Sequence, residues 1–228
     1  MKEVQAMNPA WKTLYEKCSP FSHLILQIAV YDLHTEQDKC VIILETDPQE
    51  ILGACLPLLK FCENKKLPIP LVITRAFVSS SLDSYPLEFL NISSDYINVY
   101  EREDLLKDLK FDPKDIRLQM ERELKSKWLH TRMSLLQSHL KPKNMHAILH
   151  MSLKAIIPTL KGLFLLLGHN IPKIPEQVFS QANEMTDFDI SILKKVDKAS
   201  TKELSIEMVN EYLLVLGKLT NLMETWVL

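Results

Sequence analysis

Residues 23–45 read HLILQIAVYDLHTEQDKCVIILE, two apolar runs joined by a short polar segment. The runs at 23–31 and 39–45 are rich in isoleucine, valine and leucine, residues that favour buried β-strands. The polar segment at 32–38 fits a hairpin link between them. We therefore predict two consecutive strands at the centre of a sheet-containing domain.

Helix signals flank this pair of strands. Residues 2–16 are predicted to form a helix upstream. Downstream, Asp47 is predicted to cap a helix that has Pro48 at its first position and runs to about residue 64. Three further apolar segments are predicted as strands: 68–74, 87–92 and 96–100. Helices alternating with strands predict an α/β or α+β domain.

The second half of the chain changes character at Asp112. This residue is a good helix cap, Pro113 fits the first helical position, and Asp115 adds negative charge to the first turn. No strand is predicted after Tyr100. The helices predicted beyond Asp112 are 112–139, 144–168 with a kink at Pro158, 175–184, 187–198, and one from Ser200 or Thr201 almost to the C-terminus. The expected fold is α+β: a mixed-sheet domain at 1–111, then a helical bundle at 112–228.

Composition limits the classes of function. Lys and Arg total 27 and Asp and Glu 29, so the net charge is −2 and a nucleic-acid partner is not expected. The four cysteines form no CxxC pair, which predicts free thiols in a reducing compartment. The N-terminus carries no signal-peptide pattern, and Pro158 and Lys161 interrupt the longest apolar stretch, 155–168. We therefore expect a cytoplasmic protein without a membrane span.

Glycine is scarce, with only four in 228 residues. Loops that bring backbone N–H groups against phosphates usually need glycine, because a Cβ blocks the approach. No glycine lies in a predicted strand-to-helix loop of the first domain. Walker and Rossmann phosphate loops are therefore excluded.

Three further blocks carry a resemblance: PLVIT at 70–74 with DSYPLEFLNI at 83–92, RLQMERELKSK at 117–127, and the apolar segment 160–168. Together they resemble bacterial nucleotidyltransferase-domain proteins, in which a small nucleotidyltransferase-like α/β domain precedes a helical bundle. The resemblance covers about residues 20–225, and the second block is the most specific.

The resemblance implies an active site that this chain only partly matches. Family enzymes bind the triphosphate with a Gly-Ser pair after the first strand, and bind Mg²⁺ with an Asp-x-Asp pair on the next strand and a third carboxylate. Here Ala29-Val30-Tyr31 stands where Gly-Ser is expected. Asp38 matches the first carboxylate, Cys40 replaces the second, and Glu88 is a candidate for the third.

These departures predict a catalytically degenerate protein, a pseudoenzyme that acts as a binding or regulatory module. We expect no cofactor and no resident metal. The alternative is an active Mg²⁺-dependent nucleotidyltransferase with an atypical site, in which Asp38 and Glu88 hold Mg²⁺ and an NTP.

Basic residues of the 112–139 helix are candidates for binding. Arg117, Lys125 and Arg132 are possible contacts for an anion or a partner chain, against the plainer interpretation of intrahelical ion pairs. Arg132 and His139, spaced Arg-x6-His, also match the ribonuclease motif of certain helical toxin components. That alternative makes the chain one half of a toxin–antitoxin-type pair.

His146 and His150 share one helix face, but no third ligand accompanies them, so no zinc site is predicted. The final helix is rich in leucine, which fits a bundle core and a dimer seam. We therefore expect a protein partner or a homo-oligomer.

Overall fold

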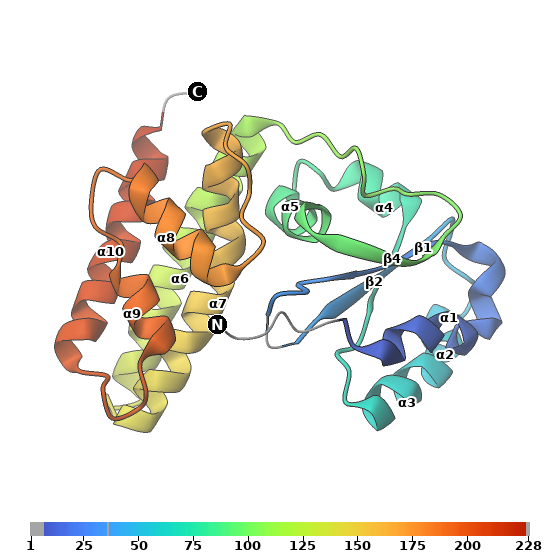
Figure 1. Cartoon of the computed structure of the whole chain (residues 1–228), viewed down its shortest axis with the longest axis horizontal. Coiled ribbons are helices and arrows are strands. Elements are labelled where there is room, and N and C mark those ends of the chain that lie inside the picture. The colour runs from blue at the N-terminus through green and yellow to red at the C-terminus, as the bar shows by residue number, and fades with distance from the viewer. Residues whose placement is uncertain (1–6, 36, 227–228) are drawn as a thin grey trace. The chain divides into compact units, whose positions relative to one another are not determined.

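The structure, a computed structural model, describes residues 7–35 and 37–226. The chain divides into two compact units, Met1–Lys110 and Phe111–Leu228 (Figure 1). We call them the α/β unit and the helical unit. The predicted α+β class, a mixed sheet with helices followed by a helical region, is confirmed.

The sheet of the α/β unit has the strand order β3-β2-β1-β4. Its strands are β1 (Ile25–Tyr31), β2 (Lys39–Leu44), β3 (Leu71–Thr74) and β4 (Tyr96–Glu101). β1 runs antiparallel to both β2 and β4, whereas β2 and β3 are parallel. The carboxyl ends of β2, β3 and β4 therefore lie at the same edge of the sheet.

Helices cover both faces of this sheet (Figure 1). One face packs against η1 (Pro9–Thr13), α1 (Leu14–Lys17), η2 (Ser19–Leu24), α2 (Ile51–Ala54) and α3 (Leu56–Lys65). The other carries α4 (Arg75–Ser80) and α5 (Pro86–Ser94). Because both faces are buried, β2 is apolar at every position from Cys40 to Leu44 instead of alternating with polar residues.

The predicted strand at 87–92 is wrong, because these residues form most of α5. Pro86 occupies the start of the helix and Glu88 its first turn, both favourable there. In the described residues, each of two predicted helices is divided into two short ones. Residues 2–6 of the first lie outside the described residues, and the described part of 2–16 forms η1 and α1. The predicted 48–64 helix is divided between α2 and α3, and Pro57 lies in the first turn of α3. The predicted cap at Asp47 is wrong, because α2 begins at Ile51 with Glu50 at the cap position.

The helical unit consists of α6 (Pro113–Gln137), α7 (Pro142–Leu166), α8 (Pro175–Met185), α9 (Ile192–Lys198) and α10 (Ile206–Thr225). α7 packs against α6, α8 and α9, and α10 packs against α6 and α9. As predicted, the Asp112 carboxylate caps α6 by accepting from the Lys114 backbone N–H at 2.8 Å. The last helix is capped by Ser205 rather than by Ser200 or Thr201.

Among the described residues, α7 alone is long and apolar enough to cross a membrane by length and composition. Most of its apolar segment is buried against the other helices of its unit, and Pro158 lies inside it. This arrangement is that of a core helix and is consistent with a soluble protein.

Candidate functional site

The Asp38 carboxylate holds the N-terminal turn in place. It accepts a hydrogen bond from the backbone N–H of Asn8 at 2.8 Å, and the Asn8 side chain in turn accepts from the backbone N–H of Ala10 at 3.0 Å. Asp38 is only half-buried, just before β2. One carboxylate oxygen of Asp38 therefore already has a structural role, because it positions Asn8, the cap residue of η1.

Cys40, the residue in the second carboxylate position, is directed into the apolar core. It is 1% exposed and belongs to the same cluster as Cys18 and Cys62. Burial raises its pKa well above the ordinary value, and the neighbouring thiols Cys18 and Cys62 add to this shift. All four cysteines are free and buried, as inert structural thiols are.

Glu88 lies on the exposed side of α5, in its first turn. It is therefore carried by a helix and not by a strand of the sheet. In the parts of the chain that the structure describes, no group of three or more His, Cys, Asp or Glu side chains is arranged to hold a metal ion.

An ion-pair cluster that the sequence analysis missed occupies the carboxyl-terminal edge of the parallel strands. Arg75, directly after β3, donates through Nε to Glu45 at 3.2 Å and through Nη1 to Glu103 at 2.7 Å. The hydrogen bond to Glu103, and after it the bond to Glu45, raises the pKa of Arg75. In return, the hydrogen bond from Arg75 lowers the pKa of Glu103. Ligands of open α/β sheets usually bind at this edge. In this protein the Arg75 guanidinium at that edge is already paired with the Glu45 and Glu103 carboxylates, so it is not available to bind a phosphate.

A second missed feature is the polar network around Asp104. Gln27, fully buried in β1, donates to the Asp104 carboxylate at 2.7 Å and to the Asn98 side-chain oxygen at 2.8 Å. Tyr96 donates to Asp104 at 2.9 Å. Burial opposes ionisation of Asp104, but the hydrogen bonds from Tyr96 and Gln27 outweigh it and lower its pKa. This network fastens the segment after β4 to the sheet.

Two of the predicted anion contacts in the helical unit have intramolecular partners. Arg117 donates to the backbone carbonyl of Met223 at 2.8 Å, in the last turn of α10, and to Glu121 at 3.1 Å. A cation at a helix C-terminus interacts favourably with the negative end of the helix dipole. Lys125 pairs with Glu121 and with Glu224, each at 2.7 Å. These contacts join α6 to α10.

Arg132 differs from these two, because it is exposed and its guanidinium lies 5.2 Å from the centre of the Trp128 ring. This distance is that of a cation–π contact, which uses none of the guanidinium N–H groups as hydrogen-bond donors to an acceptor atom. His139, the other residue of the Arg-x6-His motif, follows the end of α6. It has a left-handed backbone conformation with φ 52°, as does Leu140.

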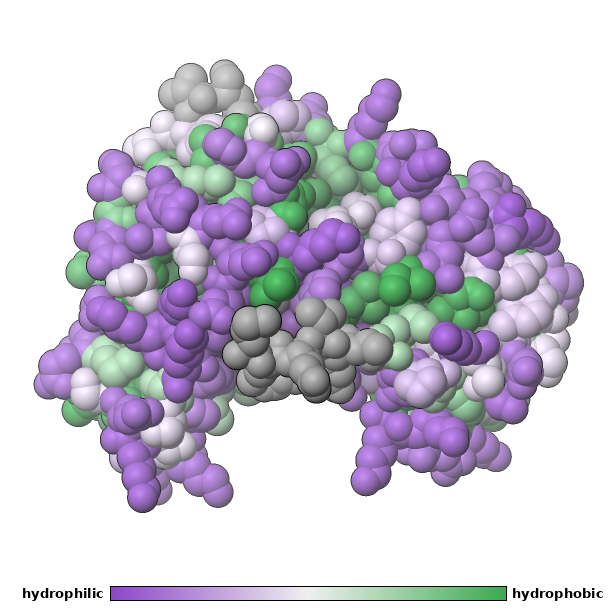
Figure 2. All heavy atoms as spheres, viewed as in Figure 1, coloured by the Kyte–Doolittle hydropathy of each residue, from purple (hydrophilic) through white to green (hydrophobic). Residues whose placement is uncertain are grey.

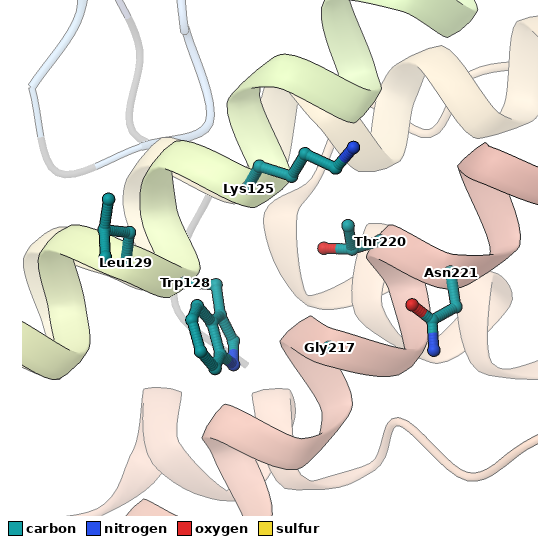
Figure 3. A pocket seen from close by; sticks show the side chains of 6 residues that line it. All are labelled: Lys125, Trp128, Leu129, Gly217, Thr220 and Asn221. Carbon is teal, nitrogen blue, oxygen red and sulfur yellow. The ribbon is translucent and has the colours of Figure 1, made fainter.

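Trp128 forms the wall of a pocket of about 420 Å³ between α6 and α10. α6 contributes Lys125, Trp128 and Leu129, and α10 contributes Gly217, Thr220 and Asn221 (Figure 3). A Cβ at Gly217 would lie 3.8 Å from the Trp128 Nε1. The missing side chain at Gly217 therefore leaves space beside the indole.

Next to this pocket, α6 exposes large apolar side chains to solvent. Leu118, Leu129 and Met133 are each about half exposed, and Leu136 is 63% exposed. The face of the helical unit that carries α8 and α9 is mainly hydrophilic by contrast (Figure 2). Sequence reasoning named the basic residues of α6 but missed the apolar ones, whose exposure depends on which side of α6 the other helices cover.

The two histidines of α7 lie together, as their spacing predicts. The ring centres of His146 and His150 are 4.3 Å apart, and His146 Nε2 is 3.1 Å from the backbone carbonyl of Ala199. The His150 Nε2 is buried and has no hydrogen-bond partner within the described chain. Burial lowers the pKa of His150, and the neighbouring His146 adds to this effect. The pair is a packing contact between α7 and the segment after α9.

Comparison with known proteins adds no assignment: no family model, no curated protein and no solved structure matches this chain. Support for a function therefore comes from the geometry of the two units themselves.

Proposed function

We propose that this chain is a non-catalytic binding or regulatory protein built on a nucleotidyltransferase-like scaffold. The observation that carries the proposal is the burial of Cys40, which is 1% exposed. A carboxylate at that position would lie in an apolar core, where an unpaired charge is strongly disfavoured. The β1–β2 hairpin therefore supplies at most one of the two carboxylates that an Asp-x-Asp metal site requires.

Two further observations support the same proposal. Ala29 and Val30 are fully buried residues of β1, so no flexible glycine lets a triphosphate approach the main chain there. At the carboxyl-terminal strand edge, Arg75 is engaged by Glu45 and Glu103. A phosphate that approached Arg75 would have to displace carboxylates that already neutralise it.

Isothermal titration calorimetry tests this proposal. The full chain is titrated with each of the four NTPs in the presence of Mg²⁺, alongside an Asp38→Ala variant. We expect no saturable heat with either protein. Micromolar binding by the wild-type chain that disappears in Asp38→Ala would overturn the proposal and favour an atypical Mg²⁺-dependent enzyme.

A further inference from the structure

We propose that the outer face of α6, together with the Trp128 pocket, binds an acidic amphipathic helix of a partner protein. The inference rests on the proposed binding function and specifies its partner. The pocket supplies the anchor point. Its walls are the Trp128 indole and Leu129, and Gly217 leaves space beside the indole (Figure 3). Such a pocket accepts a large apolar side chain, as in helix-in-groove recognition.

The composition of the exposed face of α6 indicates the charge of the partner. Among its exposed residues from Leu118 to Leu136 there are four apolar and three basic side chains, one histidine and no acidic residue. The two glutamates of this stretch, Glu121 and Glu123, are only partly exposed and already pair with lysines of α6. The exposed residues are Leu118, Arg122, Lys125, Leu129, His130, Arg132, Met133 and Leu136.

Apart from His130, these residues lie along one stripe of the helix. Leu118, Leu129 and Leu136 are separated by 11 and 7 residues, close to whole numbers of helical turns. The basic residues Arg122 and Arg132 lie between and beside them. A partner helix with apolar residues at i, i+3 or i+4, and i+7, flanked by glutamates or aspartates, is complementary in both hydrophobicity and charge.

The same charges argue against a second copy of α6 as the occupant. An antiparallel pair that sets Leu118 opposite Leu136 also sets Arg122 opposite Arg132, and a parallel pair sets each arginine against itself. Like charges in contact across an interface are unfavourable. A nucleic acid is also a poorer match, because the exposed leucines have no counterpart on a phosphate backbone.

An intramolecular contact illustrates the preference for acidic side chains. Glu224 of α10 reaches Lys125 at the rim of the pocket, with 2.7 Å between the carboxylate oxygen and Nζ. Arg132 is held over the Trp128 ring, so its guanidinium is positioned before any partner arrives. A glutamate on the partner helix would meet a fixed donor, which reduces the entropy lost on binding.

Fluorescence anisotropy tests the proposal with the full chain. The probe is a labelled helical peptide of about 18 residues, or five turns, with leucines on one face and glutamates beside them. The control peptide has lysine at every glutamate position. We expect saturable binding of the acidic peptide and at least about tenfold weaker binding of the basic one.

Two sets of variants locate the interaction. Arg122→Glu combined with Arg132→Glu changes only exposed side chains, and we expect it to weaken binding at least about tenfold. The matched control variant carries Lys143→Glu and Lys202→Glu, which reverse the charge of two exposed lysines elsewhere in the helical unit. We expect it to bind the acidic peptide as the wild type does. Gly217→Leu should also weaken binding of the acidic peptide, because the leucine side chain fills the pocket. Circular dichroism checks that this variant keeps the helix content of the wild type.

Equal binding of the two peptides, or unchanged binding by the double-arginine variant, would overturn the proposal. So would displacement of the acidic peptide by a single-stranded oligonucleotide, which would assign the face to nucleic acid. None of these three results bears on the titrations with NTPs, so the partner can be wrong while the non-catalytic assignment stands.

Discussion

The Ser152 hydroxyl of α7 accepts hydrogen bonds from Thr131 of α6 at 2.7 Å and from Tyr212 of α10 at 2.9 Å. All three side chains are buried, and Tyr212 is fully so. Burial raises the pKa of Tyr212, partly offset by its bond to Ser152. One hydroxyl group thus connects three helices at the centre of the helical unit.

Ser152→Ala should therefore destabilise the protein by about 1–3 kcal/mol, because it leaves two buried donors without an acceptor. Tyr212→Phe removes one donor and leaves Ser152 bonded to Thr131, so a smaller loss of about 1 kcal/mol is expected. Ser126→Ala, at a partly exposed site on α6, is the control and should change little. Urea denaturation measures all three. Equal stability of Ser152→Ala and Ser126→Ala would show that the linkage is energetically unimportant.

Cys40→Asp restores the carboxylate that the nucleotidyltransferase pattern expects, and it should destabilise the fold at neutral pH by about 3–5 kcal/mol, because the charge is buried and unpaired. Burial raises the pKa of such an aspartate, so the folded state binds its proton more tightly than the unfolded state. The loss of folding stability in Cys40→Asp should therefore grow as pH rises above the ordinary aspartate pKa of about 3.9. Cys40→Ala is the control, with a smaller and pH-independent loss. A Cys40→Asp variant as stable as Cys40→Ala at neutral pH would mean that this position can hold a metal ligand.

The four thiols should be unreactive in the folded protein. Burial raises the pKa of each, that of Cys18 to about 12, so little thiolate is present near neutral pH. Labelling with a chromogenic disulfide reagent at about pH 8 should be slow in buffer and complete in denaturant. Rapid labelling of even one thiol in buffer would contradict the closed core, and mass spectrometry would identify it.

His150 should make stability depend on mild acidification. Its folded-state pKa lies below the ordinary value of 6.5, so the unfolded state binds more protons in the intervening range. The stability that neutral His150 contributes to the fold is fully present above pH 6.5 and is lost as the pH falls through the folded-state pKa of His150. His146 and Lys154 favour the neutral ring, whereas Asp197 favours the charged one.

His150→Gln should therefore show a shallower fall in unfolding free energy between about pH 7 and pH 5 than the wild type. His130→Gln, at an exposed position of α6, should keep the wild-type slope. Guanidinium denaturation at several pH values compares the three proteins. If all three slopes coincide, the buried histidine is not coupled to folding.

The strong local signals of the sequence predicted most of the fold. The strands β1, β2 and β4 and the Asp112 cap of α6 all lie where the apolar runs and the Asp-Pro pair place them. The failure at 87–92 has a physical reason: a short apolar run fits a buried strand and a buried helix equally well. Pro86, at the start of that run, was the available signal for a helix.

The candidate sites were less predictable, because they depend on which elements become neighbours. Glu45, Arg75 and Glu103 lie far apart in sequence and meet only because the strand order places their strand ends at one edge. The partners of Arg117 and Lys125 on α10 are equally remote. Sequence spacing reveals contacts within one helix, whereas these contacts are tertiary.

The strand order also governs how the chain can fold as it is synthesised. β1 is flanked by β2, which follows at once, and by β4, which leaves the ribosome only after β3 and α5 have been made. Until then one long edge of a mostly apolar strand is unpaired, and such edges are prone to aggregation. The helical unit has no comparable delay, since α6 and α7 are adjacent in sequence and pack on each other. A nascent chain halted before residue 96 should therefore depend on chaperones far more than one halted after residue 110.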